Sequence, residues 1–218
     1  MKLLSIKLAR SIWYLNVRDY NAKGLSLFPA LRSIVELCKF KKVPSNEELL
    51  TENPKLEFKG GEFINQNNEA FAVALTVFEW GLIADTISST QNSDAFLSQM
   101  LNHLSEKFNF IDYERVLRNK NYVSHIHVSM EKSLQLVNPK LEEFSQYLTN
   151  NVIGHGNVSF EVGSIGFWPD QIRPIHAAPF SIERESGVPF SENSYLSVAP
   201  LPTDQHIELL TRLENILV

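Results

Sequence analysis

Hydrophobic and polar positions form their clearest pattern between Phe71 and Thr86, where they predict two strands. From Phe71 to Phe78, hydrophobic residues fall on both faces, which is typical of a strand that is covered on both sides. Glu79-Trp80-Gly81 then predicts a tight turn, because glycine adopts positive φ at little cost. Leu82 to Thr86 is expected to return antiparallel to the first strand.

A helix is predicted to follow, with Asn92 or Ser93 as its N-cap. Its hydrophobic positions recur at helical spacing. They are Phe96, Leu97, Met100, Leu101 and Leu104. Because this helix must cover the sheet, we expect Val73, Leu75 and Val77 to be buried against it.

The rest of the chain shows the same alternation of short strands and helices. Lys55 to Ile64 reads as a strand in which Gly60-Gly61 predicts a bulge or a close backbone approach. After Asn138-Pro139, a helix is expected to bury Leu141, Phe144 and Leu148, and Thr203 is expected to cap the last helix. The cluster Lys39, Lys41 and Lys42 follows a predicted helix, where cations offset the helix dipole.

Helices alternate with strand pairs, and hairpin turns are frequent. This rhythm predicts an α+β fold with a mostly antiparallel sheet and helices packed mainly on one face. The 218 residues fit a single α+β domain, 1–218. A Pro-rich C-terminal subregion is expected from about 154–218, because six of the ten prolines lie between Pro169 and Pro202.

Composition and charge narrow the function classes. The formal net charge of -5 lacks the basic excess of a general nucleic-acid binder, so nucleic acid is disfavoured as a partner. No apolar stretch approaches membrane-spanning length, so no membrane association is expected. Cys38 is the single cysteine and cannot form an internal disulfide, and we interpret it as a buried helix residue. These features favour a cytoplasmic protein.

His125 and His127 are the strongest candidates for chemistry. At positions i and i+2 of a predicted strand, both rings project from the same face. This geometry suits two imidazoles on one metal ion, or one ring acting as a base beside the other. The alternative interpretation is a solvent-facing strand surface that carries two histidines.

Asp85 is the second candidate, because it shares a predicted strand face with Ile83 and Ile87. A carboxylate on an apolar face must be hydrogen-bonded, paired or functional. The structural alternative is that Asp85 bonds to the backbone, or to the hydroxyl groups of Ser88 to Thr90. A hydrolase would use His125, His127 and Asp85 together, with Asp85 as the third metal ligand.

Phe167, Trp168, Asp170 and Arg173 bring aromatic and charged side chains together in a predicted loop, and such residues are enriched at interaction hot spots. A loop fixed to the core by its aromatic residues is the alternative. Glu183-Arg184-Glu185 is interpreted as a solvent-facing strand surface. The chain contains no Gly-x-Ser-x-Gly, Walker-type, His-Glu-x-x-His or cysteine-based metal motif, so no cofactor or metal is expected.

The sequence therefore favours a non-catalytic binding protein that acts through contacts with another macromolecule, with Phe167, Trp168, Asp170 and Arg173 as binding residues. Protein is the expected partner. A homo-oligomer, most simply a homodimer, is also expected, because a single helix layer would leave one apolar face of the Phe71 to Phe78 strand uncovered. The alternative function is a metal-dependent or histidine-based hydrolase centred on His125, His127 and Asp85.

Overall fold

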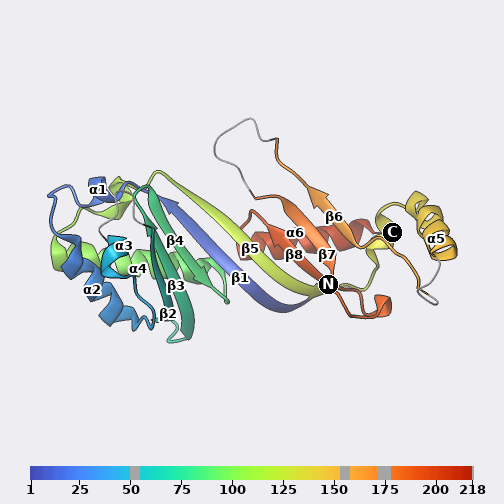
Figure 1. Ribbon diagram of the computed structural model, residues 1–218, viewed down its shortest axis with the longest axis horizontal. Helices are drawn as coiled ribbons and strands as arrows, with labels where there is room; N and C mark the ends of the chain where they lie inside the picture. Colours follow the sequence, from blue (N-terminus) through green and yellow to red (C-terminus); the bar gives the residue numbers. More distant parts are fainter. Residues whose placement is uncertain (50–54, 153–157, 171–177, 218) are drawn as a thin grey trace. The chain divides into compact units, whose positions relative to one another are not determined.

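The computed structural model describes residues 1–49, 55–152, 158–170 and 178–217 (Figure 1). The strands are β1 (Lys2–Tyr14), β2 (Leu56–Ile64), β3 (Ala70–Phe78), β4 (Gly81–Thr86), β5 (Asn119–Ser129), β6 (Ser164–Phe167), β7 (Phe180–Arg184) and β8 (Ser194–Ala199). The helices are α1 (Val17–Tyr20), α2 (Leu27–Cys38), α3 (Asn46–Leu49), α4 (Thr90–Phe108), α5 (Lys140–Asn151) and α6 (Thr203–Ile216). Among the described residues, no helix is both long and hydrophobic enough to cross a membrane.

The chain divides into two compact units. Unit 1 comprises Met1–Ile6, His125–Pro200 and Asp204–Val218, and unit 2 comprises Lys7–Ser124 and Leu201–Thr203. The predicted α+β class, with an antiparallel sheet, is confirmed. In unit 2 the strand order is β2-β3-β4-β1, and in unit 1 it is β5-β8-β7-β6.

Both units repeat one order of elements. Each has a long strand, a helix, a three-stranded meander and a final helix, and the long strand lies beside the last strand of the meander. In unit 2 these elements are β1, α2, β2, β3, β4 and α4. In unit 1 they are β5, α5, β6, β7, β8 and α6. The repeat is one of topology, and the hydrophobic pattern alone did not reveal it.

The core of unit 2 lies between one face of its sheet and the helices α1, α2 and α4. Helix α4 contributes the five hydrophobic residues that its spacing predicts, and all are buried. Val73 and Leu75 of β3 are buried in the same cluster, with Val77 packed at its margin, so the predicted core is confirmed. The other face of β3 is only partly buried, with Ala74, Thr76 and Phe78 along it. The prediction that both faces are covered is therefore wrong for this unit.

Helix α4 begins earlier than predicted. Its N-cap is Ser89, whose side chain accepts a hydrogen bond from the Asn92 amide. Ser93, a predicted cap, instead lies inside the helix, where its hydroxyl donates to the carbonyl oxygen of Ala9 at 2.8 Å. This contact fixes the first turn of α4 to β1. The sequence offers both serines as caps, and only this contact with β1 explains why Ser93 lies inside the helix.

Unit 1 has a smaller core between its sheet and α6, which lies against the strands in Figure 1. Ile126, Val128, Ile182 and Tyr195 from the sheet pack with Leu210 of α6. The stripe predicted to be buried on α5 is not buried, since Phe144 is 62% exposed. Leu141 is exposed as well, and Ser145 is the buried residue of this helix.

Strand β2 is an edge strand of the unit 2 sheet. Two features make its outer edge irregular. The register shifts between Phe58 and Gly61, which confirms the predicted bulge, and a Cβ atom on Gly61 would lie 2.5 Å from the Phe40 ring. On the edge itself, the amides of Lys41 and Lys42 donate to the Lys59 carbonyl oxygen, each at 3.1 Å, and the Lys59 amide donates to Lys42.

Within unit 2, hydroxyl groups join Leu201 and Thr203 to β5 and to the start of α4. The Thr90 amide donates to Thr203 Oγ1 at 3.0 Å, and the Thr203 amide donates to Thr90 Oγ1 at 2.9 Å. Ser124 Oγ donates to the carbonyl oxygen of Leu201 at 3.0 Å. Thr90 and Thr203 are both buried, so each hydroxyl satisfies an amide that has no partner within its own helix.

Replacing Leu75 by alanine is expected to lower the free energy of unfolding by about 2–5 kcal/mol, because Leu75 is almost completely buried in the unit 2 core. Urea denaturation followed by circular dichroism measures this loss. Thr76→Ala, on the opposite face of β3, is the control and should cost less than about 1 kcal/mol. A loss below about 1 kcal/mol for Leu75→Ala would contradict the packing of β3 against α4.

Replacing Thr203 by valine removes the acceptor for the buried Thr90 amide at nearly constant side-chain volume. We expect a loss of roughly 1–2 kcal/mol in the free energy of unfolding. Thr211→Val is the matched control, since its exposed hydroxyl only bonds the Ile207 carbonyl oxygen one turn earlier. If the two variants lose equal free energy of unfolding, the reciprocal bonds between Thr90 and Thr203 do not stabilise the protein beyond an ordinary surface hydroxyl.

Candidate functional site

The two predicted histidines lie on β5 in unit 1, on one face of the strand. The His127 side chain is 14% exposed, and its Nε2 lies 2.8 Å from Ser194 Oγ and 2.9 Å from Glu185 Oε2. The Ser194 hydroxyl donates to Glu185 Oε2 at 2.7 Å. Because the Ser194 hydroxyl proton points to Glu185, the hydrogen atom between His127 and each of these two oxygen atoms must come from His127 Nε2.

This arrangement differs from a nucleophilic Ser–His–acid triad. A catalytic base needs a lone pair facing the hydroxyl group, with the acid on its other ring nitrogen. Here the carboxylate and the hydroxyl share one protonated nitrogen of His127, and Ser194 is buried. The cluster therefore joins β5 and β8 to the residue that follows β7 and does not activate Ser194.

Asp85, the predicted third ligand, forms an ion pair with Arg10. It lies in unit 2 on β4, where Arg10 Nε donates to Oδ1 at 2.7 Å and Arg10 Nη2 donates to Oδ2 at 2.8 Å. The pair raises the pKa of Arg10, chiefly through the hydrogen bond to Asp85. Within the described ranges, no group of three or more His, Cys, Asp or Glu side chains is arranged to hold a metal ion. The hydrolase hypothesis gains no support from this geometry.

His206 of α6 is a buried histidine that the sequence analysis did not single out. Burial and, to a smaller extent, the charge of His125 lower its pKa to about 4. Ser197 Oγ donates to the Ser181 carbonyl oxygen at 2.7 Å and lies 2.9 Å from His206 Nε2. The position of His206 one turn before Leu210 places it on the apolar stripe of α6, and this spacing could have revealed it.

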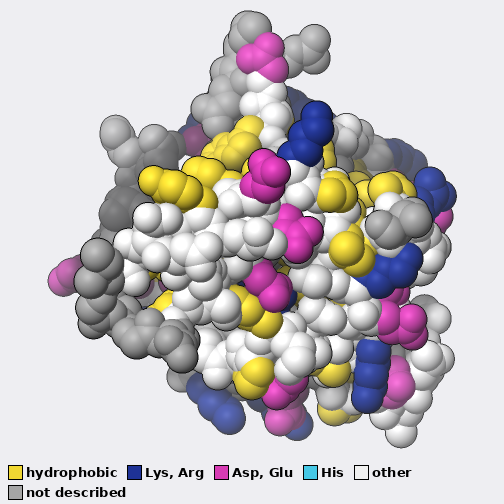
Figure 2. All heavy atoms as spheres, turned by 90° about the vertical axis from the view of Figure 1, so that its right-hand side faces the viewer, with side chains coloured by type: hydrophobic (Ala, Val, Ile, Leu, Met, Phe, Trp, Pro, Cys, Tyr) yellow, Lys and Arg dark blue, Asp and Glu magenta, His cyan; other side chains and the backbone are white. Residues whose placement is uncertain are grey.

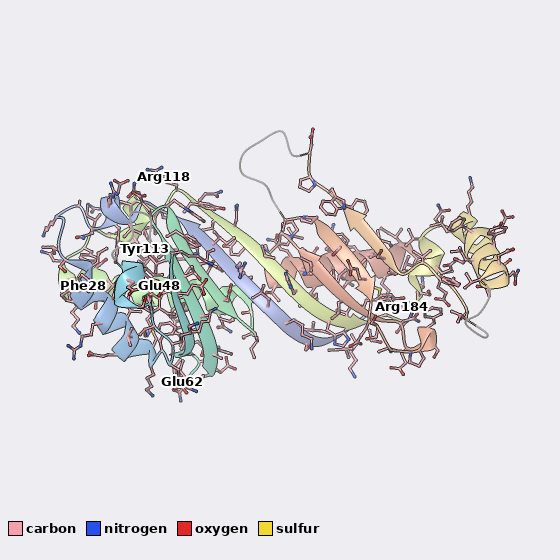
Figure 3. All side chains as sticks on the ribbon, in the orientation of Figure 1. Phe28, Glu48, Glu62, Tyr113, Arg118 and Arg184 are labelled. Carbon is pink, nitrogen blue, oxygen red and sulfur yellow. The ribbon has the colours of Figure 1, made fainter. Side chains whose placement is uncertain are left out.

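Arg184 corrects the interpretation of Glu183-Arg184-Glu185 as a solvent-facing surface. The guanidinium of Arg184, which is labelled in Figure 3, is buried, and its Nη2 lies 3.0 Å from Glu161 Oε2. It lies 4.5 Å from the centroid of the Phe190 ring and 5.2 Å from that of Tyr195. A charge of this kind is tolerated inside a protein only because it is paired and hydrogen-bonded.

The predicted aromatic loop is exposed. Phe167, at the end of β6, is 66% exposed and Trp168 is 75% exposed. Phe167 contacts Phe180 at a ring-centroid distance of 5.9 Å. Asp170 is also exposed, and Arg173 lies outside the described residues. The loop is therefore not fixed to the core by Trp168.

A second aromatic group, which the sequence analysis missed, lies on the partly exposed face of the unit 2 sheet. We call this surface the open face; it carries Arg10, Ile12, Tyr14, Thr76, Phe78, Ile83 and Asp85. Trp80, in the β3–β4 turn, stacks on Tyr14 at 5.5 Å and on Phe78 at 4.7 Å between ring centroids. All three positions are visible in the sequence, but only the strand register brings them together.

Gly81 lies between Tyr14 and Phe78 in the register of the sheet. A Cβ atom at Gly81 would lie 2.3 Å from the Trp13 carbonyl oxygen, so no side chain can occupy this position. The turn itself is held by the Leu15 amide, which donates to the Trp80 carbonyl oxygen at 3.1 Å. Trp80 remains 48% exposed. The result is a three-ring stack in which Trp80 contacts both other rings and remains about half exposed.

Two arginines contact this stack or the residue before Trp80. Arg118, labelled in Figure 3, donates its backbone amide to the Tyr14 carbonyl oxygen at 2.8 Å and pairs with Asp19 at 3.4 Å. Arg18 pairs with Glu79 at 3.0 Å. In the face drawn in Figure 2, by contrast, Asp and Glu side chains stand among hydrophobic ones, with Lys and Arg toward the margins.

The comparisons with known proteins give only a fold likeness. Neither a protein-family model nor a curated protein matches the chain. Among solved structures, it is similar to Methanococcus jannaschii TBP, with a TM-score of 0.42 and 10% sequence identity. The alignment covers 98% of this chain and 95% of that chain.

The sequence analysis expected a protein partner or a homo-oligomer and disfavoured nucleic acid, and this comparison does not support that partner prediction. The prediction rested on net charge, which describes a whole chain, whereas nucleic-acid contacts depend on the local surface.

His206 predicts a defined pH dependence of stability. Its pKa is about 4 in the folded protein and about 6.5 in the unfolded chain, so the unfolded chain binds the proton first. Stability should be complete above pH 6.5 and fall by roughly 3 kcal/mol as the pH drops from about 6.5 to about 4. Urea denaturation across this range measures the change, and His206→Gln should flatten it. An equal decrease in both proteins would contradict the assignment.

Proposed function

We propose that the chain is a non-catalytic binding protein that acts through contacts with another macromolecule, and that the open face of unit 2 binds single-stranded nucleic acid. The observation that carries the proposal is the Tyr14–Trp80–Phe78 stack, with its accessible indole on an antiparallel sheet. Sheet-borne aromatic rings are a common platform for unpaired bases, and stacking contributes about 1–3 kcal/mol per base.

The charge distribution is compatible with this ligand. Between Lys7 and Ser124, basic and acidic residues are equal in number, so the acidic excess of the chain lies outside unit 2. Arg18 and Arg118 are exposed and paired with exposed carboxylates. Surface ion pairs of this kind contribute only about 0–1 kcal/mol, so the arginines can exchange a carboxylate for a phosphate at small cost.

A cytoplasmic location is part of the proposal. Cys38 is a free, buried thiol, and the chain has no second cysteine with which it could form an internal disulfide. Burial raises the pKa of this thiol to about 11, which keeps it protonated and unreactive at neutral pH. This supports a structural role for Cys38 and is consistent with a reducing compartment.

The test is a titration of the protein with a fluorescently labelled oligothymidine at low salt, followed by anisotropy. Trp80→Ala should weaken binding by roughly 5- to 150-fold, the range that corresponds to one stacked base. Trp168→Ala is the matched control, because Trp168 is an exposed indole in unit 1. It should bind as the unchanged protein does.

Arg118→Ala gives a second readout, since removal of one phosphate contact should reduce the slope of log K against log salt by about 0.7. Thermal melting of each variant separates lost binding from lost folding. The proposal fails if the oligonucleotide does not bind at low salt, or if Trp80→Ala and Trp168→Ala weaken binding equally.

A further inference from the structure

A groove lies on the helical side of unit 2, between α2, the β2–β3 turn and α4. Its larger part has a volume of about 570 Å³. Gln66, Gln99 and Asn102 provide three carboxamides along it, and Leu37 and Phe63 provide apolar surface. A smaller hollow adjoins this part and shares Leu37, Phe63 and Gln99 with it.

The walls of the groove are held by side-chain bonds between its elements. Ser33 Oγ of α2 lies 2.9 Å from His103 Nε2 and 2.9 Å from Lys107 Nζ, both on α4. In the turn, Asn65 Nδ2 donates to Asn92 Oδ1 of α4 at 3.3 Å. The Asn65 carboxamide oxygen also accepts the Asn67 amide at 3.0 Å. The groove is therefore shaped before any ligand enters.

Ser33 also connects His103 to Lys107. Lys107 Nζ donates to Ser33 Oγ, which lies 2.9 Å from His103 Nε2. The His103 ring lines the groove beside the three carboxamides, each of which offers a donor and an acceptor.

The lining of the larger part of the groove does not favour an anionic ligand. Glu106 is the acidic side chain among the described residues that line this part, and these residues include no lysine or arginine. In the smaller hollow, Lys39 is paired with Glu62, which is labelled in Figure 3, at 3.6 Å. A phosphate group in the larger part would therefore meet a carboxylate and no lining cation.

We propose that this groove binds the uncharged purine base of a nucleoside. Carboxamides recognise adenine through paired bonds to N6 and N7, and Gln99 and Asn102 offer this donor–acceptor pair. Leu37 and Phe63 supply apolar surface for a flat ring, and Glu106 accepts from a ribose hydroxyl. The site is separate from the open face, so this inference goes beyond the proposed function.

Isothermal titration calorimetry of the full chain with adenosine tests the site. Gln99→Leu and Asn102→Leu should each weaken adenosine binding by about tenfold, because each removes a carboxamide that would bond the base. Both residues are exposed on α4, and leucine is a good helix former, so folding should persist. Gln146→Leu on α5 is the control and should leave binding unchanged.

A second comparison tests whether the groove disfavours a negative charge on the ligand. Adenosine monophosphate should bind more weakly than adenosine, and Glu106→Gln should reduce this difference. The inference is overturned if adenosine does not bind at millimolar concentration, if Gln146→Leu weakens binding as much as Gln99→Leu, or if the monophosphate binds more tightly than adenosine.

Discussion

The packing of α4 against one face of the unit 2 sheet is the contact on which the other features depend. The buried stripe of α4 covers Val73 and Leu75, and the hydroxyl bond from Ser93 to Ala9 fixes where the helix begins. Because the core lies on one side, alternate residues of the same strands form the open face. Because α2 lies beside α4 on the covered side, the groove forms between the two helices. Both proposed sites thus follow from one-sided burial.

The sequence predicted those parts of the fold that depend on local periodicity. The change from a period of two to a period of 3.6 revealed β3, β4 and α4, and the paired glycines revealed the bulge in β2. The α5 stripe followed the same rule and was predicted wrongly. Phe144 is exposed because amphipathicity identifies a helix face without identifying a surface to cover it. The periodic signal therefore predicts elements better than it predicts their partners.

The candidate sites were less predictable because their contacts join residues far apart in the chain. Asp85 was correctly recognised as a carboxylate that needs a partner, but nothing near it in the sequence identifies Arg10. Arg184 was taken for a surface residue because its neighbours are acidic, whereas Glu161, Phe190 and Tyr195 enclose it. The Tyr14–Trp80–Phe78 stack likewise depends on the register of three strands. Residue types can mark such positions, but only the fold pairs them.

The irregular outer edge of β2 affects how readily the protein aggregates at high concentration. An unpaired strand edge is a template for pairing with another molecule and for aggregation. Here Lys41 and Lys42 already occupy backbone groups of Lys59, the bulge at Gly60-Gly61 interrupts the regular ladder, and Lys55 and Lys59 add charge. Strand β6, the last strand of unit 1, is only four residues long. Both terminal strands thus disfavour the intermolecular β-pairing that would otherwise turn an antiparallel sheet into a seed for fibrils.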